Sequence, residues 1–271
     1  MAKPKALVLT GYGINCDRET EHAFNVAGGE GRRVHINDII DGREKLADYQ
    51  ILAVPGGFSY GDDIASGRVL ANKLRTNLGE QVRAFIEKGN LAIGICNGFQ
   101  VLVKSGILPG TGNGGAAQSV TLTFNESGRY EDRWVHLSVR SDKCVFTRGI
   151  ERLYLPVAHG EGRFTDGRDN GRMIDELKMN DQVVVVYCNE SGEEAGGVFP
   201  ANPNGSTADI AGICDATGRV LGMMPHPERF LHFTHHPNWT RAKASALREG
   251  RALPDEGEGL KIFQNAVSYF A

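Results

Sequence analysis

The chain has 271 residues, of which 41% are hydrophobic and 23% charged, and its formal net charge is −3. This length can bury a sizeable core. The small negative charge gives no electrostatic reason to expect nucleic acid or an anionic membrane as a partner. No apolar stretch is long enough to span a bilayer, and the N-terminus lacks the apolar core and cleavage site of a signal peptide. We therefore expect a cytoplasmic protein.

The first hundred residues alternate short apolar runs with stretches of helical periodicity. The predicted strands are 5–10, 33–36, 51–54 and 91–95, and the predicted helices are 17–27 and 64–88. Asp17 is a plausible N-cap of the first helix. Strands that alternate with helices indicate a mostly parallel, flavodoxin-like sheet with helices on both faces. Ligands of such sheets bind beyond the carboxyl ends of the strands.

The middle of the chain has a different pattern. Strands separated by polar and Gly-rich turns are predicted at 119–124, 134–139, 153–158 and 183–187, which suggests an antiparallel or mixed extension of the sheet. Two further strands, 209–214 and 220–224, flank a hairpin turn at 215–218. A last helix is predicted over 260–270. We find no internal repeat, so a single domain over 1–271 is the simplest organisation.

The stretch LAIGICNGFQ, at 91–100, carries the strongest chemical signal. An apolar run leads to Cys96, and glycines two positions before and after it permit a sharp turn into a helix. The dipole at the N-terminus of that helix favours thiolate over thiol. Cys96 is therefore a candidate nucleophile, the thiol counterpart of a serine at a nucleophile elbow. The alternative is a buried cysteine at the end of a core strand.

A thiol nucleophile needs a base, and the base needs an orienting partner. His226 and Glu228 follow the predicted strand 220–224 directly, at the sheet edge expected to carry Cys96. Backbone amides of Gly57 and Asn97 are candidates for an oxyanion hole, because each follows the end of a strand. The alternatives are an exposed loop histidine and an ordinary tight turn.

The sequences GICNGFQ at 94–100 and HPE at 226–228 together resemble the class I, or triad, glutamine amidotransferases. With PGGFSYGDDIASG and AHGEGRF, the chain is similar to the branch formed by the glutaminase subunits of phosphoribosylformylglycinamidine synthases. The resemblance covers roughly 5–230. It implies hydrolysis of L-glutamine to glutamate and ammonia through a cysteinyl acyl-enzyme, with Cys96 as nucleophile, His226 as general base and acid, and Glu228 as its orienter.

The resemblance also implies substrate contacts. Gln100 would line the glutamine pocket, and Glu161 would meet the ammonium group of the substrate. For His159, substrate contact and a structural or interface role are equally open. Four residues of the SYGDD sequence are expected to shape either the pocket or a docking surface: Ser59, Tyr60, Asp62 and Asp63.

The implied partner is a separate ATP-dependent synthetase subunit, and a small accessory subunit is a further candidate. The chain has no P-loop, so ATP and Mg²⁺ are expected on the synthetase and no cofactor in this chain. The five cysteines form no metal or disulfide spacing. The alternatives are a glutaminase subunit for another synthetase, a stand-alone γ-glutamyl or peptide cysteine hydrolase, and a non-catalytic scaffold subunit.

Two segments carry other signals. The sequence GYGINC at 11–16 imitates a dinucleotide-binding fingerprint, but its third glycine is Cys16, which we interpret as structural or near the pocket. An insertion is predicted at about 229–256. It contains three histidines without a recognisable metal-ligand spacing, followed by a basic stretch, and we interpret it as solvated or facing a partner.

Overall fold

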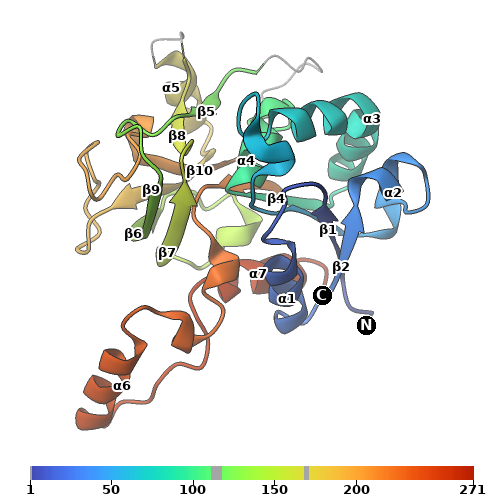
Figure 1. Cartoon of the computed structure of the whole chain (residues 1–271). Helices are drawn as coiled ribbons and strands as arrows, with labels where there is room; N and C mark the ends of the chain where they lie inside the picture. The colour runs from blue at the N-terminus through green and yellow to red at the C-terminus, as the bar shows by residue number, and fades with distance from the viewer. Residues whose placement is uncertain (1, 111–117, 168–170) are drawn as a thin grey trace.

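The computed structural model describes residues 2–110, 118–167 and 171–271 (Figure 1). Nine strands form one sheet in the order β2-β1-β3-β4-β11-β10-β9-β6-β7. Their bounds are β1 Lys5–Thr10, β2 Glu30–His35, β3 Ile51–Val54, β4 Leu91–Ile95, β6 Glu131–Val139, β7 Arg152–His159, β9 Val183–Cys188, β10 Ile210–Cys214 and β11 Val220–Met223. A small second sheet pairs β5 (Thr121–Thr123) with β8 (Arg163–Thr165).

The sheet is parallel from β2 to β11 and antiparallel from β11 to β7. This confirms the predicted mostly parallel α/β sheet. The antiparallel extension joins the same sheet through the hairpin of β10 and β11, which forms where the turn at 215–218 predicted it. The parallel strands β3 and β4 are fully buried, as expected for strands covered on both faces.

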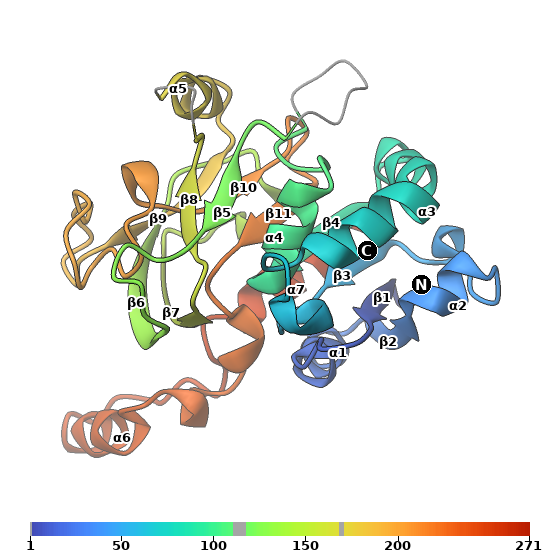
Figure 2. The same ribbon diagram turned by 45° about the horizontal axis from the view of Figure 1, so that its top comes forward.

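Helices cover both faces of the parallel half (Figures 1 and 2). On one face α1 packs against α7, with the rings of Phe24 and Phe263 edge to face at 5.0 Å, and on the other α3 packs against α4. The helices are α1 Asp17–Val26, α2 Ile36–Ile40, α3 Arg68–Glu87, α4 Asn97–Lys104, α5 Arg172–Met179, α6 Trp239–Arg248 and α7 Leu260–Ser268. Within the described ranges, none is both long and apolar enough to cross a membrane.

Short 3-10 turns connect several of these elements. They are η1 Leu46–Asp48, η2 Ser59–Asp62, η3 Val145–Thr147, η4 Thr207–Asp209, η5 Pro227–Arg229 and η6 Phe233–His235. The predicted helix 64–88 begins only at Arg68, because residues 63–67 form a turn after η2. The Asp62 carboxylate accepts hydrogen bonds there from Ser66 Oγ and Gly67 N, and Gly67 has a φ of 73°. Asp17 is the first residue of α1 and Cys16 its N-cap, so that cap prediction was wrong by one position.

The segment between η5 and α7 forms an arm that carries α6 away from the sheet (Figures 1 and 2). An antiparallel bridge between His232 and Glu256 closes its base. This arm coincides with the predicted insertion at 229–256, whose solvated or partner-facing role stays a prediction.

Candidate active site

Cys96 lies at a strained corner between β4 and α4. Its φ of 52° is positive, a conformation that costs a non-glycine residue about 1–3 kcal/mol and occurs mostly at functional sites. The Cys96 amide donates to Met223 O at 2.8 Å, which ties the corner to the end of β11. A Cβ on Gly98 would stand 1.8 Å from Val54 O, so the turn into α4 can be this tight only with glycine at that position.

His226 follows β11, which is parallel to β4, and therefore reaches the same sheet edge as Cys96. The turn η5 folds Glu228 back, and its Oε1 accepts a hydrogen bond from His226 Nδ1 at 2.6 Å. His226 is 1% exposed and Glu228 2%. A charge-assisted bond in such a dry setting is strong and fixes the ring orientation.

The charges around His226 favour its protonated form. Burial by itself lowers the pKa of the imidazole, but the Glu228 carboxylate, followed by the neighbouring side chains of Cys96 and Cys16, raises it well above the ordinary 6.5. Among the described residues, His226 Nε2 has no hydrogen-bond partner. Cys96 is 5% exposed, and its sulfur lies 3.7 Å from Ala158 O, near the end of β7.

The turn after β3 lies against both members of this pair. A Cβ on Gly56 would stand 2.8 Å from His226 Cε1 and 3.5 Å from Cys96 Cβ. The next residue, Gly57, has a φ of 147° and forms an isolated antiparallel β-bridge with Ile14. The Asn97 amide is the first of α4 and has no intrahelical acceptor. Both amides predicted for an oxyanion hole thus adjoin the thiol corner, and their role stays a prediction.

The side chains predicted to hold glutamine are engaged with one another. Gln100 Nε2 donates to Glu161 O at 2.6 Å, and Gln100 Oε1 accepts from Asn97 Nδ2 at 2.9 Å. The Glu161 carboxylate accepts from Ser66 N at 3.3 Å and faces Lys104 Nζ at 3.9 Å. In this structure Lys104 is therefore the cationic partner of Glu161. The resemblance gives that role to the ammonium group of the substrate.

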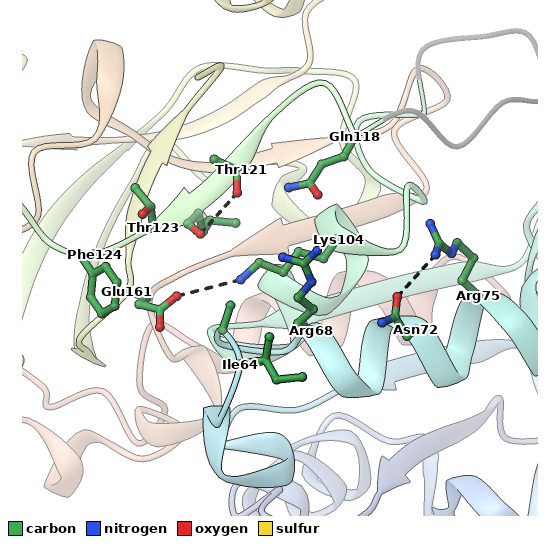
Figure 3. Close-up of a pocket in the computed structure, with 12 residues that line it drawn as sticks. Ile64, Arg68, Asn72, Arg75, Lys104, Gln118, Thr121, Thr123, Phe124 and Glu161 are labelled. Atoms are coloured by element: carbon green, nitrogen blue, oxygen red, sulfur yellow. Dashed lines mark hydrogen bonds and ion pairs between the residues drawn. The ribbon is translucent and has the colours of Figure 1, made fainter. Parts of the chain in front are cut away.

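Glu161 and Lys104 also line a cavity of about 290 Å³ between α3, α4 and β5 (Figure 3). Arg68 and Arg75 of α3 add two further cations to its wall. Burial lowers the pKa of Lys104, and the Glu161 and Asp62 carboxylates oppose that shift. Cys96 is not among the lining residues, so this cationic cavity is separate from the thiol.

Comparisons with known proteins agree with this geometry. The family model described as a CobB/CobQ-like glutamine amidotransferase domain matches residues 3–270. The chain belongs to this family of glutamine amidotransferases. A relative from Methanococcus maripaludis strain S2, named phosphoribosylformylglycinamidine synthase subunit PurQ, is 50% identical over 98% of this chain and 97% of its own. A Dehalococcoides mccartyi protein of the same name is 49% identical over 99% and 98%.

Solved structures show the same amidotransferase architecture. A chain of the structure described as PurLQS from Thermotoga maritima superposes with a TM-score of 0.71 at 31% identity, covering 99% of this chain and 100% of that one. A further glutamine amidotransferase from Thermotoga maritima shares the fold at 14% identity, with a TM-score of 0.52 over 100% of this chain and 98% of its own.

The structure favours the structural alternative for His159. Its ring is 3% exposed, with Nδ1 3.1 Å from Asn125 Oδ1 and Nε2 3.5 Å from Asn204 Nδ2. Burial, followed by the neighbouring charge of His226, lowers the pKa of His159 to about 3, so the ring is neutral at physiological pH. The ring therefore holds the amidotransferase's 159–162 turn in place rather than facing solvent.

Several residues of the site were not identified from the sequence. Asn125 and Asn204 carry no local motif, and only the fold brings them to His159. Lys104 follows Gln100 by one helical turn, a spacing that offered a signal for their shared contact with Glu161. Of the SYGDD residues, Ser59 N donates to Asn97 Oδ1 at 3.2 Å, so this sequence supports the helix that follows Cys96.

Proposed function

We propose that this chain is the glutaminase subunit of phosphoribosylformylglycinamidine synthase. It hydrolyses L-glutamine and delivers ammonia to a separate ATP-dependent synthetase subunit, which converts formylglycinamide ribonucleotide to formylglycinamidine ribonucleotide. The observation that carries the proposal is a buried His226–Glu228 pair at the Cys96 corner, in a chain 50% identical over nearly its full length to a PurQ protein. ATP and Mg²⁺ belong to the partner, and this chain holds no cofactor of its own.

The site residues divide the chemistry between them. The Cys96 sulfur attacks the side-chain amide carbon of glutamine, and the Gly57 and Asn97 amides stabilise the oxyanion that forms. His226, which holds the proton of the Cys96 thiol as an imidazolium, gives it to the departing nitrogen. The nitrogen leaves as ammonia, and the acyl group stays on Cys96 as a thioester. The neutral imidazole then takes a proton from water, whose oxygen attacks the thioester and releases glutamate. When glutamate leaves, the proton stays on His226 beside the Cys96 sulfur, and Glu228 stabilises this imidazolium.

The ammonia must reach the partner without meeting bulk water, where protonation would remove its nucleophilic electron pair. Exposed aromatic side chains border the site: Phe58 is 44% exposed and Tyr130 52%, with their rings 6.4 Å apart. Tyr130 is close enough to the site for the charges of Cys96, Arg229 and His226 to act on it. We place the synthetase on this face and the complex in the cytoplasm.

Labelling with a glutamine-analogue chloroketone tests the proposal. Mass spectrometry should find the adduct on Cys96 alone, and an excess of L-glutamine should block it. Glutamine hydrolysis by the isolated chain should be weak and rise when the synthetase and its ligands are added. Labelling at Cys214 instead, or full activity without response to any synthetase, would point to another hydrolase. An unlabelled Cys96 with intact synthetase binding would indicate a scaffold subunit.

A further inference from the structure

A second cysteine lies beside the catalytic imidazole. Cys16 stands at the N-terminus of α1 and is 3% exposed, and its amide donates to Gly56 O at 3.2 Å. A Cβ on Gly56 would be 3.3 Å from Cys16 Sγ and 2.8 Å from His226 Cε1. Cys16 Sγ, a ring nitrogen of His226 and a carboxylate oxygen of Glu228 all lie within 4.8 Å of one another. The sulfur therefore belongs to the wall of the catalytic centre.

Arg229 holds this sulfur in place. Its Nη2 donates to Cys16 Sγ at 3.2 Å, across 213 positions of sequence. Arg229 is the last residue of η5, the turn that carries His226 and Glu228 into position. The contact thus ties the start of α1 to the loop of the catalytic base. Because the Arg229 guanidinium already contacts the Cys16 sulfur, it also disfavours binding of a metal ion by Cys16, His226 and Glu228.

The sulfur contacts two groups that carry positive charge. The ionisable side chains around His226 are Glu228 and Arg229 of η5, Cys96 at the β4–α4 corner, Cys16 at the N-cap of α1, His159 of β7 and Tyr130 before β6. His159 is neutral at physiological pH. Arg229 is therefore the permanent cation among these groups, and the Cys16 sulfur that it contacts lies within 4.8 Å of a ring nitrogen of His226.

We propose that Cys16 and Arg229 form a positioning pair for His226 in the glutaminase reaction. The pair holds the imidazole so that Nδ1 meets Glu228 while Nε2 is left for Cys96, and the sulfur reduces the repulsion between guanidinium and imidazolium. Cys16 is not a second nucleophile, because its sulfur is engaged by Arg229 and by Asn15 Oδ1 at 3.3 Å. The inference rests on the proposed function, since it concerns the base of that reaction.

Cys16→Ala, in complex with the synthetase, tests the pair. Misplacing the base lowers kcat for glutamine hydrolysis, by about ten- to a hundredfold, while KM for glutamine changes less than about twofold. Loss of the sulfur also moves the alkaline limb of the kcat profile to lower pH, because the imidazolium then loses its proton more easily. Cys16→Ser should restore part of both losses, since its hydroxyl also accepts from Arg229. Arg229→Gln should lower kcat without the shift to lower pH, because it removes the cation.

Cys214→Ala is the matched control, since Cys214 is equally buried but ends β10 at the opposite edge of the sheet. Its kcat and pH profile should match the wild type. An unchanged kcat and pH profile in Cys16→Ala, or equal losses in Cys214→Ala, would overturn the inference. Cys96→Ser separates the two proposals: if it keeps glutaminase activity the proposed function fails, and if it is inactive while Cys16→Ala is normal, only the positioning pair fails.

Discussion

At the scale of single residues, the charge of Glu228 decides the protonation state of the base. Burial of His226 opposes its positive form, yet the carboxylate 2.6 Å from Nδ1 raises the pKa of the imidazole well above 6.5. In the proposed reaction, His226 therefore holds at neutral pH the proton that the departing ammonia needs. Activity that depends on this proton persists until the pH rises through the raised pKa.

Glu228→Gln should narrow the pH range over which glutamine is hydrolysed. Without the carboxylate, burial dominates and the pKa of His226 falls, so the alkaline limb of kcat for glutamine should move to lower pH. Since the amide also orients the ring less well, kcat at neutral pH should fall by about 10²–10⁴-fold. Steady-state glutaminase assays across pH measure both. An alkaline limb that stays in place would contradict this role of Glu228.

Gly56 tests how closely the site is packed. In Gly56→Ala the new Cβ would stand 2.8 Å from His226 Cε1, so the imidazole must move. We expect glutaminase kcat to fall by about a hundredfold, with ammonia-dependent synthesis by the complex unchanged. Gly79→Ala is the matched control, because Gly79, like Gly56, lacks a positive φ and a Cβ there meets no atom within 4 Å. Equal kcat losses in both variants would refute the packing argument.

At the scale of elements, the buried side chain of Asn125 links the turn after β7 to the loop after β5. Asn125 Nδ2 donates to Arg129 O and His159 O, each at 2.8 Å, and its Oδ1 accepts from Gly162 N at 2.9 Å. Removing this side chain leaves buried backbone groups without partners.

Asn125→Ala should therefore lower the free energy of unfolding by about 2–4 kcal/mol, as expected for two or more orphaned buried groups. Asn125→Asp keeps the acceptor but loses the donor, and should fall between this variant and the wild type. Chemical denaturation measures all three. A loss below about 0.5 kcal/mol in Asn125→Ala, the range of ordinary surface substitutions, would contradict the assigned contacts.

Elements with strong apolar patterns were predictable, whereas those defined by distant partners were not. β1, β3 and β4 have the predicted bounds because they are continuous apolar runs in the sheet centre. β2 begins at Glu30 rather than 33, since an edge strand with one neighbour needs few apolar residues. In the site, the strand ends bring Cys96, His226 and Glu228 to one edge of the sheet, as expected, and their catalytic roles stay predictions. The spacing of Gln100 and Lys104 indicated a shared contact, but only tertiary packing makes Glu161 their partner.

At the scale of the whole molecule, the catalytic edge and its exposed aromatic residues form one face. Tyr12, 65% exposed and 5.8 Å from the ring of Tyr60, extends that face beyond Phe58 and Tyr130. Val26 ends α1 at the opposite edge of the sheet and is exposed as well.

Tyr12→Asp should weaken synthetase binding at least tenfold, because it places a charge in an apolar contact, whereas Val26→Asp should leave the dissociation constant within twofold. Calorimetric titration of the synthetase with each variant measures this. Equal affinities for both variants would place the interface elsewhere, with the α6 arm as the next surface to test.

The central claim is that Cys96 releases ammonia that passes directly to the synthetase. The most direct test supplies the complex with glutamine labelled with ¹⁵N in the side-chain amide, together with an excess of unlabelled ammonium, and measures ¹⁵N in formylglycinamidine ribonucleotide. We predict nearly full labelling with the wild type, and unlabelled product formed only from ammonium with Cys96→Ser. Labelled product from Cys96→Ser, or dilution of the wild-type label by the ammonium pool, would contradict the account.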